Sequence, residues 1–176
     1  GLAALPAKAQ SIDTVPAWDG IQFISSWGEP NTATYGQLLP AATPNLLSEF
    51  TFYLQRTSGT APDYRAYVYQ WDSVNNVIVG PELFRSDSLT APSDSTFTPV
   101  TIDTGGVLLS AGAQYELFFS TSEASNVANA AYRYGAVPDS IYTGGNFVFQ
   151  NNSDSFSDLS TATWSSLSQD LAFSAI

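Results

Sequence analysis

The sequence contains no cysteine and no histidine, and only five of its residues are lysine or arginine. Without cysteine the chain cannot form disulfides. Without histidine it lacks the commonest general base and the commonest ligand for transition metals. The sixteen acidic residues give a formal net charge of −11, which argues against binding to nucleic acid or to an anionic membrane surface.

Long apolar runs are also missing, so the sequence predicts no transmembrane segment. No glycine-rich phosphate loop is present either, since Gly105-Gly106 and Gly144-Gly145 are isolated pairs of the kind found in hairpin turns. What remains is a chain of 176 residues, 44% hydrophobic and 12% charged. Such a chain is long enough for one globular domain with a real core and too short for two.

The strongest strand pattern runs from Tyr64 to Trp71, with turn-forming residues on both sides. Because side chains alternate between the two faces of a strand, Arg65, Tyr67, Tyr69 and Trp71 share one face. Both faces carry bulky or apolar groups, which favours a central position in a sheet. Pro81 and Pro99 interrupt two other strand patterns and mark edges or breaks, because proline cannot donate to a ladder.

Short strand patterns recur along the whole chain at the spacing of an all-β sandwich. Helix is nearly absent, with short candidates only at 122–131 and 160–166. The sequence therefore predicts one antiparallel β-sandwich, jelly-roll-like, with about ten strands. The predicted strands cover 21–27, 34–39, 48–55, 64–71, 77–79, 82–85, 97–103, 114–121, 130–134, 146–150 and 170–175. The predicted core consists of Phe50, Phe52, Leu54, Tyr115, Leu117, Phe119, Phe147, Phe149, Leu171 and Phe173.

Several of these segments together resemble a group of secreted bacterial β-sandwich proteins. The resemblance is carried by packing residues in Phe50–Leu54, Ala66–Asp72, Gly80–Phe84, Gln114–Ser120, Asn146–Asn152 and Asp170–Phe173. It implies the sandwich fold and a location outside the cell. Members of that group often end in a PEP-CTERM sorting tail, which these 176 residues do not contain.

The first residues suggest export. Ala7-Lys8-Ala9 is a small-x-small pattern of the kind that signal peptidase recognises, so we expect a secreted or cell-surface protein. Pro6 and Pro16 keep this region extended. We therefore divide the chain into an N-terminal arm, residues 1–15, which is a signal-peptide remnant or a donor segment, and a sandwich domain, residues 16–176.

The sequence favours a protein that is not an enzyme. Its carboxylates are scattered over predicted strand ends and loops, no pair is singled out by spacing for glycosidase chemistry, and no nucleophilic triad can be assembled without histidine. No cofactor is predicted. Calcium is the metal that oxygen ligands would suit, and the weak candidates are Asp154, Asp158 and Asp170. A turn-forming role explains the first two equally well.

Two functions fit this chain, and the first is self-assembly into a surface layer or filament. An extended arm from one copy would complete a sheet edge of the next. Its apolar contacts would be Leu2, Leu5, Ile12 and Val15, and the acceptor would be an edge that contains Pro81 or Pro99. The competing interpretation is a monomer whose arm packs on its own domain.

The alternative function is carbohydrate binding through an exposed aromatic platform. Flat apolar rings stack on sugar rings while polar groups at the rim give specificity. Core packing between the sheets is the competing explanation for the same rings. The candidate sugar-binding residues are Arg65, Tyr67, Tyr69, Trp71, Tyr132, Arg133, Tyr134 and Trp164.

Overall fold

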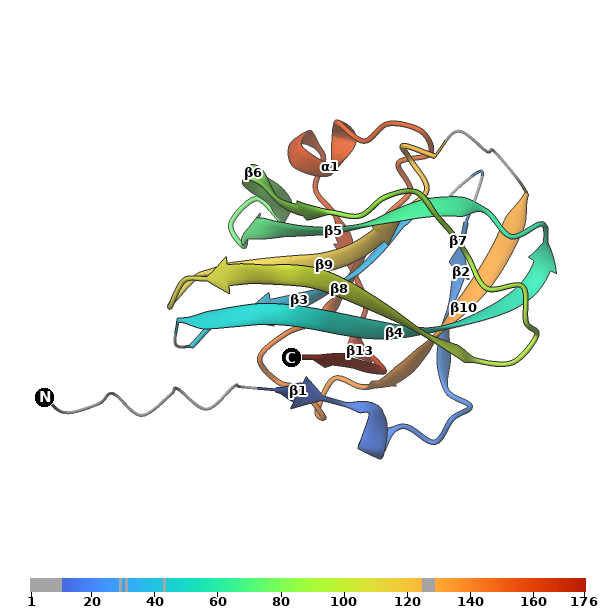
Figure 1. The fold of residues 1–176 in the computed structure, drawn as a ribbon, viewed down its shortest axis with the longest axis horizontal. Helices are drawn as coiled ribbons and strands as arrows, with labels where there is room; N and C mark the ends of the chain where they lie inside the picture. Colours follow the sequence, from blue (N-terminus) through green and yellow to red (C-terminus); the bar gives the residue numbers. More distant parts are fainter. Residues whose placement is uncertain (1–10, 29, 31, 43, 125–128) are drawn as a thin grey trace, which may run out of the picture.

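Two antiparallel sheets pack face to face in the computed structural model (Figure 1), which describes residues 11–28, 30, 32–42, 44–124 and 129–176. The predicted β-sandwich is confirmed. Most connections pass from one sheet to the other, as in a jelly roll. The first sheet contains β1 (Ile12–Asp13), β2 (Phe23–Trp27), β4 (Asn45–Gly59), β8 (Thr98–Leu109), β10 (Ala130–Pro138), β13 (Gln169–Leu171) and β14 (Phe173–Ala175). The second contains β3 (Thr34–Pro40), β5 (Asp63–Asp72), β6 (Val77–Arg85), β7 (Leu89–Thr90), β9 (Gln114–Ser120), β11 (Phe147–Gln150) and β12 (Ser165–Ser166).

The core between the sheets follows the predicted register. Alternation along β4 turns Phe50, Phe52 and Leu54 inward, and β9 supplies Leu117 and Phe119 from the opposite sheet. Nine of the ten predicted core residues are buried, and Phe149 is partly buried against the same cluster. A slip of one residue would have turned all of these side chains outward, so the inward faces predicted from alternation are confirmed.

The prolines lie on edges, as predicted. Pro81 belongs to β6, which ends the strand order of the second sheet, and Pro99 belongs to β8, which pairs with β4 alone among the described strands. Around Gly80, whose φ is +77°, β6 shifts register against β5 and continues as one strand rather than as the two predicted. A missing N–H does no harm on an edge that pairs with nothing.

Residues 12–14, which the sequence assigned to the N-terminal arm, bond to the C-terminal strands of the sandwich. Ile12 pairs with Ala175 of β14 and packs against the core of its own chain. The hydroxyl of Thr14 donates to the carbonyl of Leu171 at 2.7 Å and accepts the N–H of Phe173 at 2.9 Å. Figure 1 shows β1 beside the C-terminal strands. The predicted donor segment is thus corrected for Ile12, and Leu2 and Leu5 lie outside the described residues.

Helical structure is limited to two short elements among the described residues. A 3-10 turn, η1 (Val15–Ala17), leaves Val15 half-buried. The helix α1 (Asp158–Thr161) begins two residues before the predicted helix at 160–166 and overlaps only its first two residues. Residues 122 and 123 form a turn, Ala130 already belongs to β10, and 125–128 are outside the described residues. No helix of the described residues is long and apolar enough to cross a membrane.

Candidate functional site

The predicted aromatic platform is not exposed, which corrects the first expectation about the site. Tyr67, Tyr69 and Trp71 do share the outer face of the second sheet, but each is at most 9% exposed. A segment around α1 covers them, and its Trp164 lies edge-on to Trp71 at 5.6 Å between ring centroids. Figure 1 shows α1 on the far side of this sheet from the first. These rings form a second apolar cluster rather than a binding surface.

Tyr132 and Tyr134 are core residues as well. Both are fully buried between the sheets, and Trp27 lies within 5.6 Å of each ring. The hydroxyl of Tyr132 donates to the carbonyl of Pro92 at 2.7 Å. The prediction that they bind sugar is therefore wrong, and the alternative of core packing holds for both.

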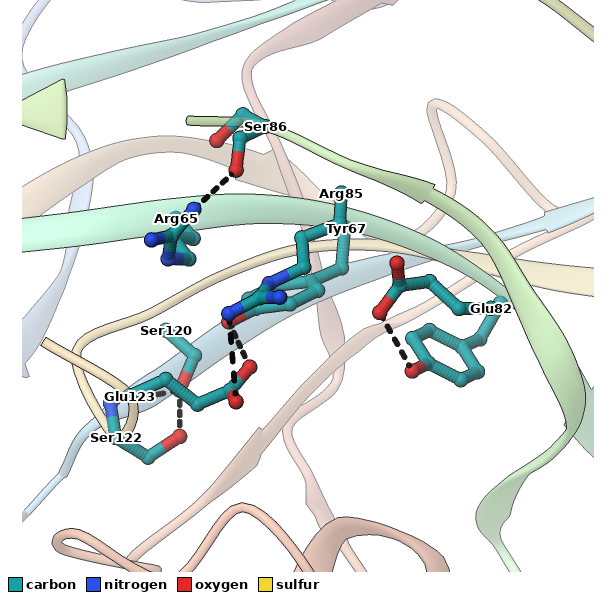
Figure 2. Close-up of polar contacts among 9 residues, drawn as sticks. Arg65, Tyr67, Glu82, Arg85, Ser86, Ser120, Ser122 and Glu123 are labelled. Carbon is teal, nitrogen blue, oxygen red and sulfur yellow. Dashed lines mark hydrogen bonds and ion pairs between the residues drawn. The ribbon is translucent and has the colours of Figure 1, made fainter. Parts of the chain in front are cut away.

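A polar rim lies beside the covered rings (Figure 2). The Tyr67 hydroxyl donates to Glu123 at 2.6 Å, and Arg85 forms an ion pair with the same carboxylate at 3.6 Å. Arg65, a predicted sugar ligand, donates instead to the backbone carbonyl of Ser86 at 2.7 Å. These contacts tie Tyr67, Arg65 and Arg85 to neighbouring groups of the protein at the edge of the covered cluster.

Two carboxyls are buried among the residues that the structure describes. Glu116 is fully buried on β9, neither of its oxygens has a hydrogen-bond partner among the described residues, and burial raises its pKa well above the ordinary 4.5. Asp170 accepts a hydrogen bond from Gln37 at 2.9 Å, and burial raises its pKa to about 6. Burial disfavours the charged form of both carboxyls, because the low-dielectric interior solvates a charge poorly.

The calcium candidates do not meet. Asp154 and Asp158 are exposed near α1, whereas Asp170 is buried and held by Gln37. Across the described part of the chain, no three acidic side chains gather closely enough to hold an ion. The structure thus assigns the first two aspartates to a turn and a helix end, and Asp170 to the interior.

An open groove lies instead on the outer face of the first sheet, and we call it the aromatic groove. It encloses about 570 Å³, within the range of small-ligand sites. Its walls include Trp18 and Phe97, whose ring centroids are 4.9 Å apart, and Tyr53, which lies 5.3 Å from Trp18. We define the groove by Trp18, Phe23, Tyr53, Gln55, Phe97 and Arg133.

Local sequence explains how Trp18 reaches this position. Asp19 follows it, and one carboxylate oxygen accepts the backbone N–H groups of Ile21 and Gln22 at 2.8 and 2.7 Å. This turn brings the Gln22 carbonyl to the Trp18 indole N–H at 2.9 Å. The ring then lies over Gly135 of β10, where a Cβ atom would come within 2.7 Å of it. Only glycine leaves room for the indole there.

The opposite wall is pinned to β4 by two contacts. The Gln55 amide donates to the carbonyl of Ser95 at 2.6 Å, and the backbone N–H of Arg56 donates to the carbonyl of Asp94 at 3.1 Å. These bonds hold the loop that precedes β8, and the loop carries Phe97 to the edge of Trp18. The groove is therefore built before any ligand arrives.

Arg133 is the one predicted sugar ligand that lines the groove. It lies on β10 opposite Gln55, and its guanidinium sits 4.0 Å from the centroid of the Phe23 ring. That stacking is a cation–π contact, which orients the guanidinium without using its N–H donors. Ile21, 74% exposed, and Phe23, 38% exposed, extend the apolar surface beside it.

Sequence reasoning missed Trp18, Tyr53 and Phe97. Alternation with the core residues Phe50, Phe52 and Leu54 turns Tyr53 to the outer face of its strand, but nothing in the pattern places the other two rings beside it. The usable signal was Trp18-Asp19-Gly20, a tryptophan directly before a turn, since a large aromatic side chain in such a segment must find a surface to cover. No known protein-family model matches the sequence, and no curated protein is significantly similar to it.

Proposed function

We propose that this protein is a non-catalytic, extracellular carbohydrate-binding module, and that the aromatic groove is its binding site. The observation that carries the proposal is the grouping of three partly exposed rings, Trp18, Tyr53 and Phe97, in one preformed groove. Flat apolar faces beside polar groups are what a sugar ring requires. The Ala7-Lys8-Ala9 pattern supports the extracellular location.

Several features support a binding role over catalysis. The groove combines apolar walls with only two strongly polar side chains, Gln55 and Arg133. The two buried carboxyls lie elsewhere, Glu116 on β9 of the second sheet and Asp170 on β13 beside Gln37. The groove therefore offers recognition without an acid and base pair of the kind that glycosidases use.

Tryptophan fluorescence provides a direct test. Trp18 is partly exposed, whereas Trp27, Trp71 and Trp164 are at most 4% exposed. Titration with soluble oligosaccharides should change the emission of Trp18 selectively, and Trp18→Ala should abolish the change. Because covering an aromatic side chain contributes about 1.5–3 kcal/mol, we expect the same substitution to weaken retention on polysaccharide gels roughly ten- to hundredfold.

Two further variants make this test decisive. Leu108→Ala removes a side chain that is 68% exposed on β8, outside the groove, and should bind as the wild type does. Ile21→Ser alters the groove at a side chain that is 74% exposed, so it should fold normally and still weaken binding. If none of the groove variants changes retention on any polysaccharide that binds the wild type, the groove is not the site.

Self-assembly stays a second proposal with less support. The open edge of β8 favours it, since among the described strands β8 pairs only with β4 and an unpaired edge can accept a strand from another copy. Against it, the part of the predicted donor arm that the structure describes pairs with β14 of its own chain. The aromatic groove is the more specific feature, and we therefore place carbohydrate binding first.

A further inference from the structure

We propose that the sugar bound in the aromatic groove carries a carboxylate, as a hexuronic acid does, and that Arg133 binds that group. This inference rests on the proposed function and specifies that the sugar is negatively charged. Its basis is that Arg133 differs from the other described basic side chains in what it contacts.

Three of the four described arginines have acceptors within the protein. Arg56 donates to the carbonyl of Gly59 at 3.4 Å, Arg65 donates to the carbonyl of Ser86 at 2.7 Å, and Arg85 pairs with Glu123 at 3.6 Å. Over the residues that the structure describes, the guanidinium of Arg133 stacks on the Phe23 ring and makes no hydrogen bond or ion pair. In a chain with sixteen acidic residues, the N–H donors of Arg133 therefore stay available to a ligand that enters the groove.

The geometry of Arg133 suits a carboxylate better than a neutral hydroxyl. A guanidinium presents its N–H donors as a planar fork, which matches the two oxygens of a carboxylate. Stacking on Phe23 at 4.0 Å holds this fork at the groove wall. A pyranose ring that covers Trp18 and Tyr53 would place a ring carboxylate within the groove that Arg133 lines, so the two kinds of contact act on one sugar.

The charges around the groove also favour an anionic sugar, although the whole chain has a net charge of −11. None of the described residues that line the groove is acidic. The adjacent Asp19 directs one oxygen to the N–H groups of Ile21 and Gln22, which lowers its pKa. Exposed charges farther away than about 8 Å are largely screened at physiological ionic strength. The attraction of Arg133 for an anionic sugar in the groove is therefore stronger than the repulsion from the acidic residues outside it.

A matched pair of polymers tests the inference. Polygalacturonate carries a carboxylate on every ring, and its fully methyl-esterified form has the same backbone without charge. The wild type should bind the acid roughly ten- to hundredfold more tightly than the ester, the range expected for a charge-assisted hydrogen-bonded pair. Arg133→Gln should remove this preference. Arg56→Gln makes the same charge change outside the groove lining and should preserve it.

The possible results separate this inference from the function on which it rests. The wild type could bind acid and ester equally, with both weakened by Trp18→Ala. This result would support carbohydrate binding in the groove and refute the proposal that the sugar carries a carboxylate. Equal losses in Arg56→Gln and Arg133→Gln would show nonspecific attraction and overturn it too. Binding of neither polymer, with no effect of Trp18→Ala on other glycans, would overturn both. If Arg133→Gln instead dissociates an oligomer in sedimentation, the groove is an interface between copies and the inference fails.

Discussion

Replacing Glu116 with glutamine should make the protein more stable, and the gain should grow with pH. The side chain is fully buried on β9 and neither of its oxygens has a hydrogen-bond partner among the described residues. Burial raises its pKa well above the ordinary 4.5, so the folded protein holds this carboxyl neutral. Glutamine has nearly the same shape and never ionises, which isolates the effect of the proton.

Proton linkage gives the sign and size of the change in the free energy of unfolding that Glu116→Gln causes. Below pH 4.5 the carboxyl of Glu116 is protonated in the folded and unfolded states alike, so the substitution should change the free energy of unfolding little. Above that pH only the folded state keeps the proton. The stability of the wild type then falls by about 1.4 kcal/mol per pH unit until the folded pKa is passed. Between pH 4.5 and the raised pKa of the folded state, the variant should therefore gain on the wild type at that same slope.

Urea unfolding followed by fluorescence, from pH 4 to pH 8, measures this difference. Asp87→Asn, at an exposed side chain, serves as the control and should follow the wild-type profile. Changes at other carboxyls, including Asp170, occur in wild type and variant alike and cancel in the comparison. Parallel profiles for the wild type and Glu116→Gln would mean that Glu116 is charged in the folded protein, which would refute its placement in an apolar, unpartnered position.

Two further stability predictions concern the same region of the fold. Burial raises the pKa of Asp170 from 3.8 to about 6, so its contribution to stability is complete below pH 3.8 and is lost as the pH rises to about 6. Asp170→Asn should flatten that part of the urea-unfolding profile, and an unchanged profile would contradict its burial. Gly36→Ala should destabilise the protein by roughly 1–3 kcal/mol, because its Cβ would meet the Glu116 carboxyl and lie 2.8 Å from the Cβ of Phe118. An unchanged midpoint of thermal unfolding would show that the sheet has room for a methyl group there.

Alternation alone was enough to predict the sandwich and its core. Phe50, Phe52 and Leu54 recur with a period of two, and a strand with that period can bury them only by turning them to one side. The two edge strands were equally readable, since Pro81 and Pro99 each remove a donor. These features depend on neighbours in sequence, which is why the sequence reveals them.

The covered face and the aromatic groove depend on segments that are distant in sequence. The outward rings Tyr67 and Trp71 look the same in a strand pattern whether solvent or Trp164 lies above them. The groove combines a turn near Trp18 with positions on β4 and β10 and with Phe97, so no single window contains its pattern. Arg133, predicted as a sugar ligand, does line the groove, although the aromatic residues predicted to accompany it are buried elsewhere.

The central position of β14 in the first sheet has a consequence for how this protein is made. Phe173 pairs with Phe52, which a ribosome adds roughly 120 residues earlier. At about 5–20 residues per second, β4 waits on the order of ten seconds for this neighbour. Pairings of such long range also fold slowly. Until β14 is made, the stretch of β4 from Phe50 to Phe52 lacks the strand that pairs with it in the folded sheet, and an unpaired edge of this kind can pair with a strand of another chain.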